Sequence, residues 1–568
     1  MELVKLPGVK KYTKNKTTGL DDINIHLVLM ILFVAGFVFR VLLLHYRFAV
    51  TFDEVNYLKL GVSAYKNGFS SALHTYWSPL LPVLIAVTCK LFSNYELAAR
   101  FVSIFAGSLL IFPVYWLGKY VYNKKVSLVA AFFVAFYPPL VFQSTQILTE
   151  PVYMLLATTV MFCGLKMLYE YSVAYAFFSG LISGLLYLIH PLGFGFTLLL
   201  IFWIITGTLF KLFLINKFRL IYMILSFLFG FLVIASPYLF YLKNVTGTWT
   251  LSAKASANQQ MEAHVPGGVD LFRSLDEQNK HVVIDQIYHQ GDFIQATHAG
   301  KRPVEHVALK PLLVKYIENV SKMFSQAIPQ FLTLIPLMLL SLGLLGHTWL
   351  NKQGIKILYL LSCIVFYWLI VIPLFHINLR YLSPLLPLCS IWIAGGAYHV
   401  YDWLSDYLPL AKFSYKHRVA PNRIAMMIIL ITFLGGSFLP ELGKVLHLNP
   451  TSDDYYADPV GQKRAGLWLK KHADKSPVIM SRNHAVDIYA GNYNIKESVT
   501  VPVNKINRII EYAKNRGVNY LVLNERYERD YEQIAFLLEG KNIPAGLQLI
   551  YREKDPSGLI TVIYEFLS

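Results

Sequence analysis

Residues 25–45 read IHLVLMILFVAGFVFRVLLLH, and the acidic stretch FDEVNY follows at 52–57. The apolar run matches the roughly 20 residues that cross a bilayer and exceeds the apolar core of a cleaved signal peptide. It is therefore predicted to be a retained membrane anchor. The basic segment before it, residues 1–24, is predicted to be a cytoplasmic tail, because positively charged segments are translocated poorly.

The composition of the whole chain is that of an integral membrane protein. Of its 568 residues, 55% are hydrophobic and only 15% are charged, whereas soluble domains carry about 25% charged residues. The net charge of +17 does not indicate nucleic-acid binding, because residues 441–568 are nearly balanced in charge. The excess lies mostly in short loops between apolar runs, where it reflects topology. No nucleic-acid partner is predicted.

Further apolar runs predict an α-helical polytopic protein with about 11 transmembrane helices. The runs lie at 25–45, 99–118, 127–143, 151–168, 174–190, 193–211, 221–242, 327–349, 357–375, 381–403 and 424–440. In the resulting topology the inner segments carry 18 Lys and Arg, and the short outer loops carry one. This asymmetry predicts a cytoplasmic N-terminus and, with an odd number of helices, an outer C-terminus.

The same topology divides the chain into parts. After the tail, a transmembrane domain is predicted over 25–440, with two long outer loops at 46–98 and 243–326. An extracytoplasmic α/β domain is predicted over 441–568, because short apolar strand patterns alternate there with helical patterns. The strands are expected at 477–481, 519–524, 547–551 and 559–564, and the helices at about 460–472, 504–516 and 528–539. The last two strands are predicted to form a hairpin, and this tail has no glycine-rich phosphate loop.

Asp53 and Glu54 are adjacent carboxylates just outside the first helix. One interpretation is structural, a solvated loop or the cap of a helix. The other is functional: a general base beside a carboxylate that orients a substrate or a cation. Glu150, Arg100 and Arg380 are predicted at the same outer level. Ionisable groups of both signs at one level favour a polar cavity, and arginine is well suited to a phosphate group.

Aromatic and histidine residues lie on the same outer side. His74 and Trp77 precede Pro79 in the first outer loop, and His190 ends an apolar run. Trp77 belongs either to an interfacial aromatic belt or to a wall of the cavity that stacks on a sugar. The histidines serve either in capping and packing or in the cavity.

Taken in order, several short motifs resemble the GT-C glycosyltransferases that use polyprenyl-phosphate sugars. The nearest resemblance is to the branch that contains protein O-mannosyltransferases and lipid A aminoarabinose transferases. The matching residues are Asp53, Glu54 and Tyr57, then Ser78–Leu80, Glu96 with Arg100, and Arg380-Tyr381 followed by Pro384 and Pro387. The resemblance covers roughly residues 25–400, and the tail is similar to the extracytoplasmic α/β domain of many bacterial members.

The resemblance implies a role for each charged residue. Asp53 would deprotonate or align the acceptor for an inverting attack on the anomeric carbon, and Glu54 would support Asp53 or contact the acceptor. Arg100 would bind the donor phosphate and stabilise the leaving group, and Arg380 would share that work. Glu150 would line the cavity, at a position where many relatives have Asp.

The resemblance also implies a set of residues that line the cavity: Tyr57, His74, Trp77, His190 and Tyr381. His190 stands where many relatives carry Lys, and a histidine can be neutral near pH 7. Some relatives bind a divalent cation, so this cofactor is allowed. No His, Asp or Glu spacing in this sequence predicts a metal site.

The predicted function is a multi-pass membrane glycosyltransferase. It would move a hexose or a pentose from a polyprenyl-phosphate donor to a lipid, glycan or protein acceptor on the outer face, which is the plasma membrane surface in a prokaryote. The protein is expected to lie in the membrane, in contact with its lipids. One alternative is a transporter or flippase, although the predicted helix centres carry almost none of the charges that transport uses. Another is a polymerase or ligase that joins lipid-linked glycans.

Overall fold

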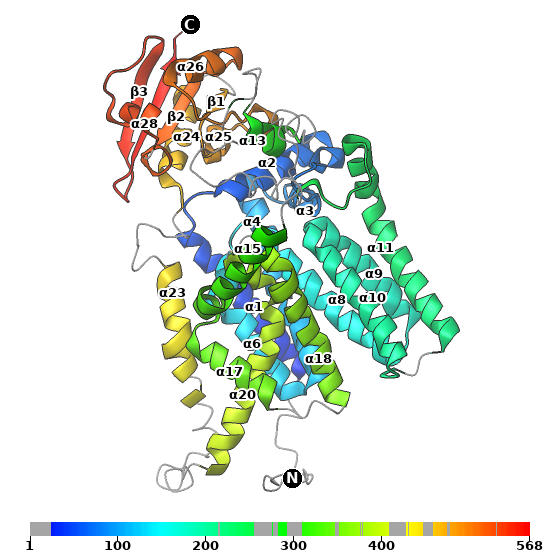
Figure 1. Cartoon of the computed structure of the whole chain (residues 1–568). Coiled ribbons are helices and arrows are strands. Elements are labelled where there is room, and N and C mark those ends of the chain that lie inside the picture. Colours follow the sequence, from blue (N-terminus) through cyan, green and yellow to red (C-terminus); the bar gives the residue numbers. More distant parts are fainter. Residues whose placement is uncertain are drawn as a thin grey trace, which may run out of the picture.

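Apolar helices form the larger part of the molecule, and a small α/β unit covers one end of them in the computed structural model of the chain (Figure 1). The structure describes residues 24–213, 216–254, 275, 282–291, 309–346, 352–374, 377, 379–407, 428–429, 431–446, 458–473, 477–529 and 531–567. All but the last residue of the predicted basic tail, and much of the predicted outer loop at 243–326, lie outside the described residues.

The helical part consists of α-helices joined by short turns and by brief 3₁₀ or π-helical segments (η). In chain order these are α1 (Ile25–Leu43), η1 (Leu44–Tyr46), α2 (Phe52–Asn67), η2 (Phe69–Ala72), α3 (Leu80–Thr88), α4 (Tyr95–Leu109), α5 (Ile111–Val121), α6 (Lys124–Phe136), α7 (Pro138–Gln143), α8 (Glu150–Glu170), α9 (Val173–Ile189), η3 (Pro191–Gly193), α10 (Phe194–Leu209), α11 (Lys217–Thr246), α13 (Val283–Asp285), η5 (Gln286–Gln290), α15 (Leu309–Lys322), η6 (Met323–Ala327), α16 (Ile328–Leu332), α17 (Leu334–Leu345), α18 (Lys352–Val365), η7 (Phe366–Val371), η8 (Ile372–Leu374), α19 (Leu379–Leu382), η9 (Ser383–Leu385), α20 (Leu386–Tyr407), η10 (Leu434–Phe438) and α23 (Leu439–Val445).

Six helices among the described residues are long and apolar enough to cross a bilayer. A seventh crossing arises if Leu313–Leu332 and Leu334–Leu345, which meet at a bend of 106°, form one span. The structure does not confirm the predicted count of about 11, because some apolar runs fold as shorter pieces. The run at 127–143 is divided into α6 and α7 at Pro138, and the run at 174–190 forms the 17-residue α9. The chain is a multi-pass membrane protein.

The segment predicted as the first outer loop, 46–98, is largely helical. It contains α2 and α3, and α2 begins with a capping box. Glu54 accepts hydrogen bonds from the backbone N–H of Thr51 (2.6 Å) and from the Thr51 hydroxyl (2.8 Å). The Thr51 side chain in turn faces the backbone N–H of Glu54, and this reciprocal arrangement satisfies N–H groups that the first turn of a helix leaves without partners. Thr51 rather than Asp53 is the cap, so the Asp53 carboxylate is directed elsewhere.

The α/β unit, residues 458–567, contains one four-stranded mixed sheet in the order β1-β2-β4-β3. Its elements are α24 (Val460–His472), β1 (Ile479–Met480), α25 (Ala485–Ala490), η11 (Ile495–Glu497), α26 (Ile506–Asn515), β2 (Tyr520–Asn524), α27 (Glu525–Glu528), α28 (Glu532–Ala535), η12 (Phe536–Glu539), β3 (Leu547–Lys554) and β4 (Ile560–Phe566). The predicted hairpin of the last two strands is confirmed, since β3 pairs antiparallel with β4. The predicted helix at 528–539 is instead divided between short pieces.

Buried ion pairs fasten the α/β unit to the helical part. Lys59 of α2 lies 2.6 Å from Asp487 of α25, and both side chains are at most 2% exposed. Arg47 lies 2.8 Å from Asp458, which also accepts a hydrogen bond from the backbone of Ala49. Breaking a buried pair from one side leaves a charge without compensation, so these contacts fix the unit above α2.

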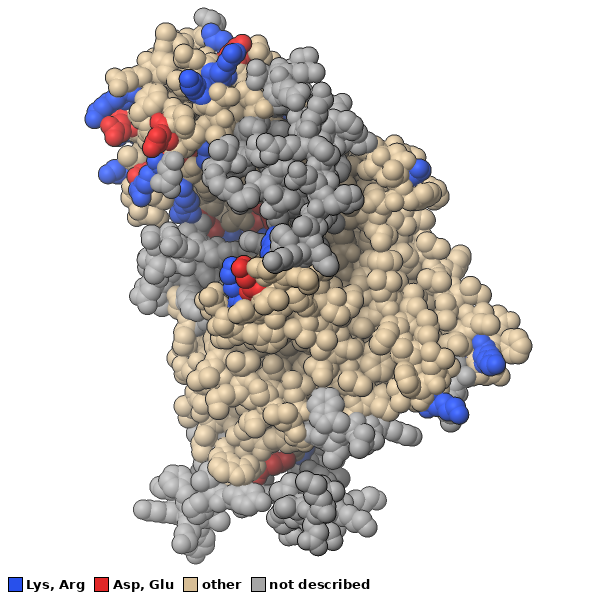
Figure 2. Space-filling model, in the orientation of Figure 1, with Lys and Arg blue, Asp and Glu red and all other residues tan. Residues whose placement is uncertain are grey.

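The surface of the helical part is almost free of charge on the face in Figure 2, whereas Lys, Arg, Asp and Glu gather on the α/β unit. A broad apolar band is the surface expected for contact with lipid. Charged side chains reappear at the junction between the two parts.

Candidate active site

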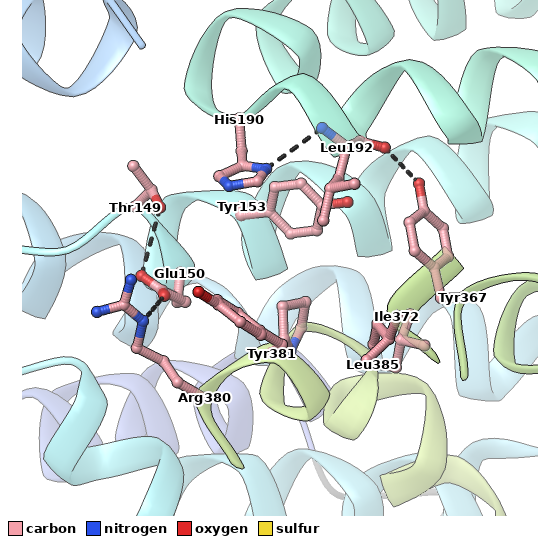
Figure 3. A pocket seen from close by; sticks show the side chains of 11 residues that line it. Thr149, Glu150, Tyr153, His190, Leu192, Tyr367, Ile372, Arg380, Tyr381 and Leu385 are labelled. Carbon is pink, nitrogen blue, oxygen red and sulfur yellow. Dashed lines mark hydrogen bonds and ion pairs between the residues drawn. The ribbon is translucent and has the colours of Figure 1, made fainter. Parts of the chain in front are cut away.

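A pocket opens at the end of the helical part that faces the α/β unit, between α8, α9, η8 and α19 (Figure 3). Its wall combines polar and apolar side chains, which are Thr149, Glu150, Tyr153, His190, Leu192, Tyr367, Ile372, Arg380, Tyr381, Pro384 and Leu385. A pocket with a few convergent polar groups in an apolar wall is the usual form of a ligand site.

The charged centre of the pocket is Arg380, which bridges two carboxylates. Its Nη2 donates a hydrogen bond to Oδ2 of Asp53 at 2.7 Å, and its Nε lies 2.6 Å from Oε1 of Glu150. Asp53 lies in the first turn of α2 and Glu150 in the first turn of α8. Helix N-termini favour negative charge. The first turns of α2 and α8 therefore stabilise the two carboxylates, and Arg380 between them holds both close together.

Asp53 and Arg380 are both reachable from solvent, with side-chain exposures of 27% and 20%, whereas Glu150 is 8% exposed. Burial alone raises the pKa of Asp53, but the charges of Arg380 and Lys254 outweigh it and hold that pKa below its usual range. Asp53 is therefore ionised at neutral pH, as a base must be before it accepts a proton.

Lys254 is a second cation of this site that the sequence did not single out. Its ammonium lies 5.0 Å from the ring centre of Tyr76 and 5.4 Å from that of Trp77, within the range of cation–π attraction. Burial lowers the pKa of Lys254, while the carboxylates of Asp53 and Glu150 oppose that shift. In the sequence Lys254 is one lysine in a long polar loop, and only folding places it beside Asp53.

Tyr57 and Tyr381 were both predicted to lie in the cavity wall, and of the two Tyr381 lines the pocket. Tyr57 is 3% exposed and packs edge-on against Trp77, with the ring centres 5.1 Å apart. Burial and the nearby carboxylates Asp53 and Glu150 raise the pKa of Tyr57, so it remains a neutral hydroxyl.

His190 also lines the pocket, and its state follows from a hydrogen bond. Its Nδ1 accepts from the backbone N–H of Leu192 at 3.2 Å. A ring nitrogen that accepts carries no proton, so this imidazole is neutral. His190 therefore offers an Nε2–H donor rather than the fixed positive charge of a lysine.

His74 and Trp77 hold a neighbouring segment of chain in place. The Nδ1 of His74 accepts from the backbone of Trp77 at 3.2 Å, and the Trp77 indole donates to the carbonyl of Tyr288 at 2.9 Å. Burial lowers the pKa of His74 to about 3, which excludes a cationic role at neutral pH. Neither residue lines the pocket itself. Both pack against the segment 282–291.

Glu54 and Arg100 lie next to each other, and neither of them lines the pocket. Arg100, 3% exposed, lies 3.4 Å from Glu54 and 2.8 Å from Glu96, and donates to the carbonyl of Thr145 at 2.7 Å. Glu54 also accepts from the backbone N–H of Ile147 at 2.7 Å. The positive charges of Arg100 and Arg47 outweigh burial and lower the pKa of Glu54. This satisfied network differs from the expectation that Arg100 binds a donor phosphate and that Glu54 contacts the acceptor.

Replacing Arg100 with Ala is expected to lower the free energy of unfolding by about 3 kcal/mol or more, because it leaves Glu54 buried beside one cation fewer. The midpoint of thermal unfolding in detergent measures this. Arg529→Ala is the matched control, since the Arg529 side chain is 64% exposed in its pair with Glu525 and such pairs contribute little. Equal midpoints for the two variants would contradict the structural role.

One group of side chains has the spacing to hold a metal ion among the residues that the structure describes: Asp285, His289 and His484. All of them are buried, and none lines the pocket. Sequence spacing could not predict this group, because His484 belongs to the α/β unit and the other two to the segment at 282–291.

The fold assembled around this site is that of the GT-C glycosyltransferases. The chain is similar to the archaeal oligosaccharyltransferase AglB from Archaeoglobus fulgidus, solved in complex with an inhibitory peptide and a dolichol-phosphate, with a TM-score of 0.56 and 14% identity over 96% of this chain and 74% of that one. It is also similar to ArnT from Cupriavidus metallidurans bound to undecaprenyl phosphate, with a TM-score of 0.53 and 12% identity over 95% of this chain and 97% of that one. At these identities the likeness shows a shared fold.

The sequence alone matches no protein family and no curated protein. The fold and the site therefore carry the functional argument.

Proposed function

We propose that the chain is a membrane glycosyltransferase that moves a sugar from a polyprenyl-phosphate donor to an acceptor. The observation that carries the proposal is an ion pair at the edge of the pocket, where the ionised carboxylate of Asp53 lies 2.7 Å from Arg380 of the pocket wall and also feels the charge of Lys254. The GT-C fold supports it, as do the polyprenyl phosphates in the neighbouring structures.

Arg380 and Lys254 are proposed to bind the donor phosphate, the work that the sequence assigned mainly to Arg100. A guanidinium can present two parallel N–H groups to phosphate oxygens, and an ammonium adds a point charge. The apolar residues Leu192, Ile372 and Leu385 line the same pocket, so a lipid chain attached to that phosphate would find an apolar surface there.

The charges of the site suit the transfer. Asp53 and Glu150 are balanced by Arg380 and Lys254 before substrate enters. When Asp53 takes the acceptor proton it becomes neutral, while cleavage of the anomeric carbon–oxygen bond places one more negative charge on the leaving phosphate. The acceptor oxygen forms the new bond from the opposite side, with inversion. A negative charge thus moves from Asp53 to the phosphate while both cations stay in place, which is electrostatic stabilisation where charge develops.

The reaction is proposed to occur on the outer face, with the α/β unit outside. The support is the excess of Lys and Arg in the predicted inner segments, together with the α/β unit at one end of the helical part (Figure 1).

The test is turnover of purified protein in nanodiscs with a panel of polyprenyl-phosphate hexoses and pentoses, read as release of polyprenyl phosphate. Separate reactions supply a lipid, a glycan and a peptide acceptor. Release that depends on one acceptor class supports the proposal and identifies the acceptor. If the donors are neither bound nor cleaved in any reaction, the proposal fails and a transporter becomes the better account.

As the pH is lowered, turnover is expected to fall only below the usual pKa range of an aspartate, because the pKa of Asp53 is lowered. Replacing Lys254 with Gln removes one of the charges that lower it, so the acid limb of the pH–rate profile should move to higher pH. Lys66→Gln is the matched control, since the Lys66 ammonium also lies over two rings, at 5.7 Å from Tyr95 and from Tyr493. Identical acid limbs in wild type and Lys254→Gln would contradict the role of Lys254.

A further inference from the structure

A buried group of metal-binding side chains lies outside the pocket, where the segment 282–291 meets the α/β unit. Asp285 and His289 are four residues apart in that segment, and His484 lies just before α25. Residues four apart on a helical turn point in the same direction. One ligand atom from each side chain lies within 4.8 Å of the other two. The exposed fractions are 1%, 2% and 3% in the same order.

We propose that Asp285, His289 and His484 bind a Zn²⁺ ion that joins the segment 282–291 to the α/β unit. Two imidazoles and one carboxylate are ligands that zinc accepts. Zinc bonds of about 2.0–2.2 Å in a tetrahedron separate ligand atoms by roughly 3.3–3.6 Å. The limit of 4.8 Å exceeds this separation, so binding would draw the three side chains closer together.

The contacts of His484 prepare it for a metal. Its Nδ1 lies 3.2 Å from Oδ2 of Asp487, and Asp487 is itself held by Lys59 of α2 at 2.6 Å. A metal-binding histidine commonly donates its second N–H to a carboxylate, which fixes the ring and leaves the other nitrogen for the metal. In this arrangement Nε2 of His484 is the ligand atom, and the metal would replace its present contact with the Thr500 hydroxyl at 3.1 Å.

The other two side chains are also fixed in orientation. The backbone N–H of Thr500 donates to Oδ2 of Asp285 at 2.9 Å, and Nδ1 of His289 lies 3.1 Å from Oδ1 of Asp285. The rings of His289 and His484 meet edge-on at 4.7 Å. Both ring nitrogens of His289 are buried and have no hydrogen-bond partner among the residues that the structure describes. A buried nitrogen without a partner is costly, and a metal ion would satisfy it.

A cross-link here would act on a segment that also contacts the first outer segment of the chain. The segment 282–291 is tied on its other side to the first outer segment, where Thr75 donates to the carbonyl of Gly291 at 2.8 Å and Trp77 donates to Tyr288 at 2.9 Å. Lys254 lies on the ring of that same Trp77. The ion would therefore join the α/β unit to the chain that supports Lys254, with a water molecule in the fourth position that the three side chains leave open.

Metal content is the test, measured by mass spectrometry on the full chain purified without a polyhistidine tag. About one zinc ion per chain is expected in wild type, and roughly tenfold less or lower in His289→Ala and His484→Ala. His472→Ala is the matched control, because His472 is an exposed histidine of the α/β unit, and it should keep the zinc of wild type.

A second measurement does not depend on the variants folding. Removing metal from wild type with a chelator should lower the midpoint of thermal unfolding, and added Zn²⁺ should restore it while added Mg²⁺ should not. The proposal is overturned if wild type carries no zinc and added Zn²⁺ leaves its midpoint unchanged, if the zinc survives in His484→Ala, or if iron fills the site in place of zinc.

Discussion

Replacing Asp53 with Asn is expected to lower kcat by about 10²–10⁴-fold, the range that a positioned general base contributes. The amide keeps the size of the carboxylate and can still accept a hydrogen bond from Arg380, but it cannot take a proton at neutral pH. Because Asp53 is 27% exposed at the pocket, the substitution should not disturb packing. Donor binding and the midpoint of thermal unfolding should stay near those of wild type. Release of polyprenyl phosphate, followed over time, gives the rate.

The matched control is Glu511→Gln, which makes the same change of charge at a side chain that is 58% exposed on the α/β unit. It should turn over as wild type does. If Asp53→Asn were to keep wild-type turnover with a donor that the wild type cleaves, Asp53 would not be the base.

Replacing Arg380 with Gln is expected to lower kcat/KM by about 30-fold or more, the equivalent of about 2 kcal/mol. The loss has two causes. The donor phosphate loses its guanidinium, and Asp53 and Glu150 then face each other without the cation that lies between them at 2.7 and 2.6 Å. The second effect raises the pKa of Asp53, so the acid limb of the pH–rate profile of the remaining activity should move to higher pH.

Arg380→Lys separates charge from geometry, because it keeps the positive charge and loses the planar fork. It should recover part of the donor affinity that Arg380→Gln loses, as measured by binding of a polyprenyl-phosphate sugar in nanodiscs. Arg508→Gln, at a side chain that is 57% exposed, is the control. Donor affinity equal to that of wild type in Arg380→Gln would remove Arg380 from the phosphate site.

The residues that the sequence placed together correctly are those whose position depends on helix ends. Asp53 follows the first apolar run, Glu150 begins α8 and Arg380 precedes α20, and loops of one face of a membrane protein must meet at that face. The positions of helix ends predict the depth of a residue in the membrane, but they do not predict the direction in which its side chain points. Arg100 lies at the predicted level and turns away, toward Glu54 and two backbone carbonyls.

Other parts of the site depend on long-range folding. Lys254 has no neighbour in sequence that marks it, and the group of Asp285, His289 and His484 joins segments about 200 residues apart. The strands of the α/β unit could be predicted, since β2 and β4 are apolar runs bounded by turn residues. The six-residue α25 could not, because it is too short to show helical periodicity.

The most direct test of the account is a structure, by electron cryo-microscopy, of the Asp53→Asn variant in nanodiscs with a polyprenyl-phosphate sugar bound. We expect the phosphate in the pocket, in contact with Arg380 and Lys254, and the anomeric carbon of the sugar facing residue 53. A phosphate bound at Arg100, or a sugar that lies away from residue 53, would contradict the account.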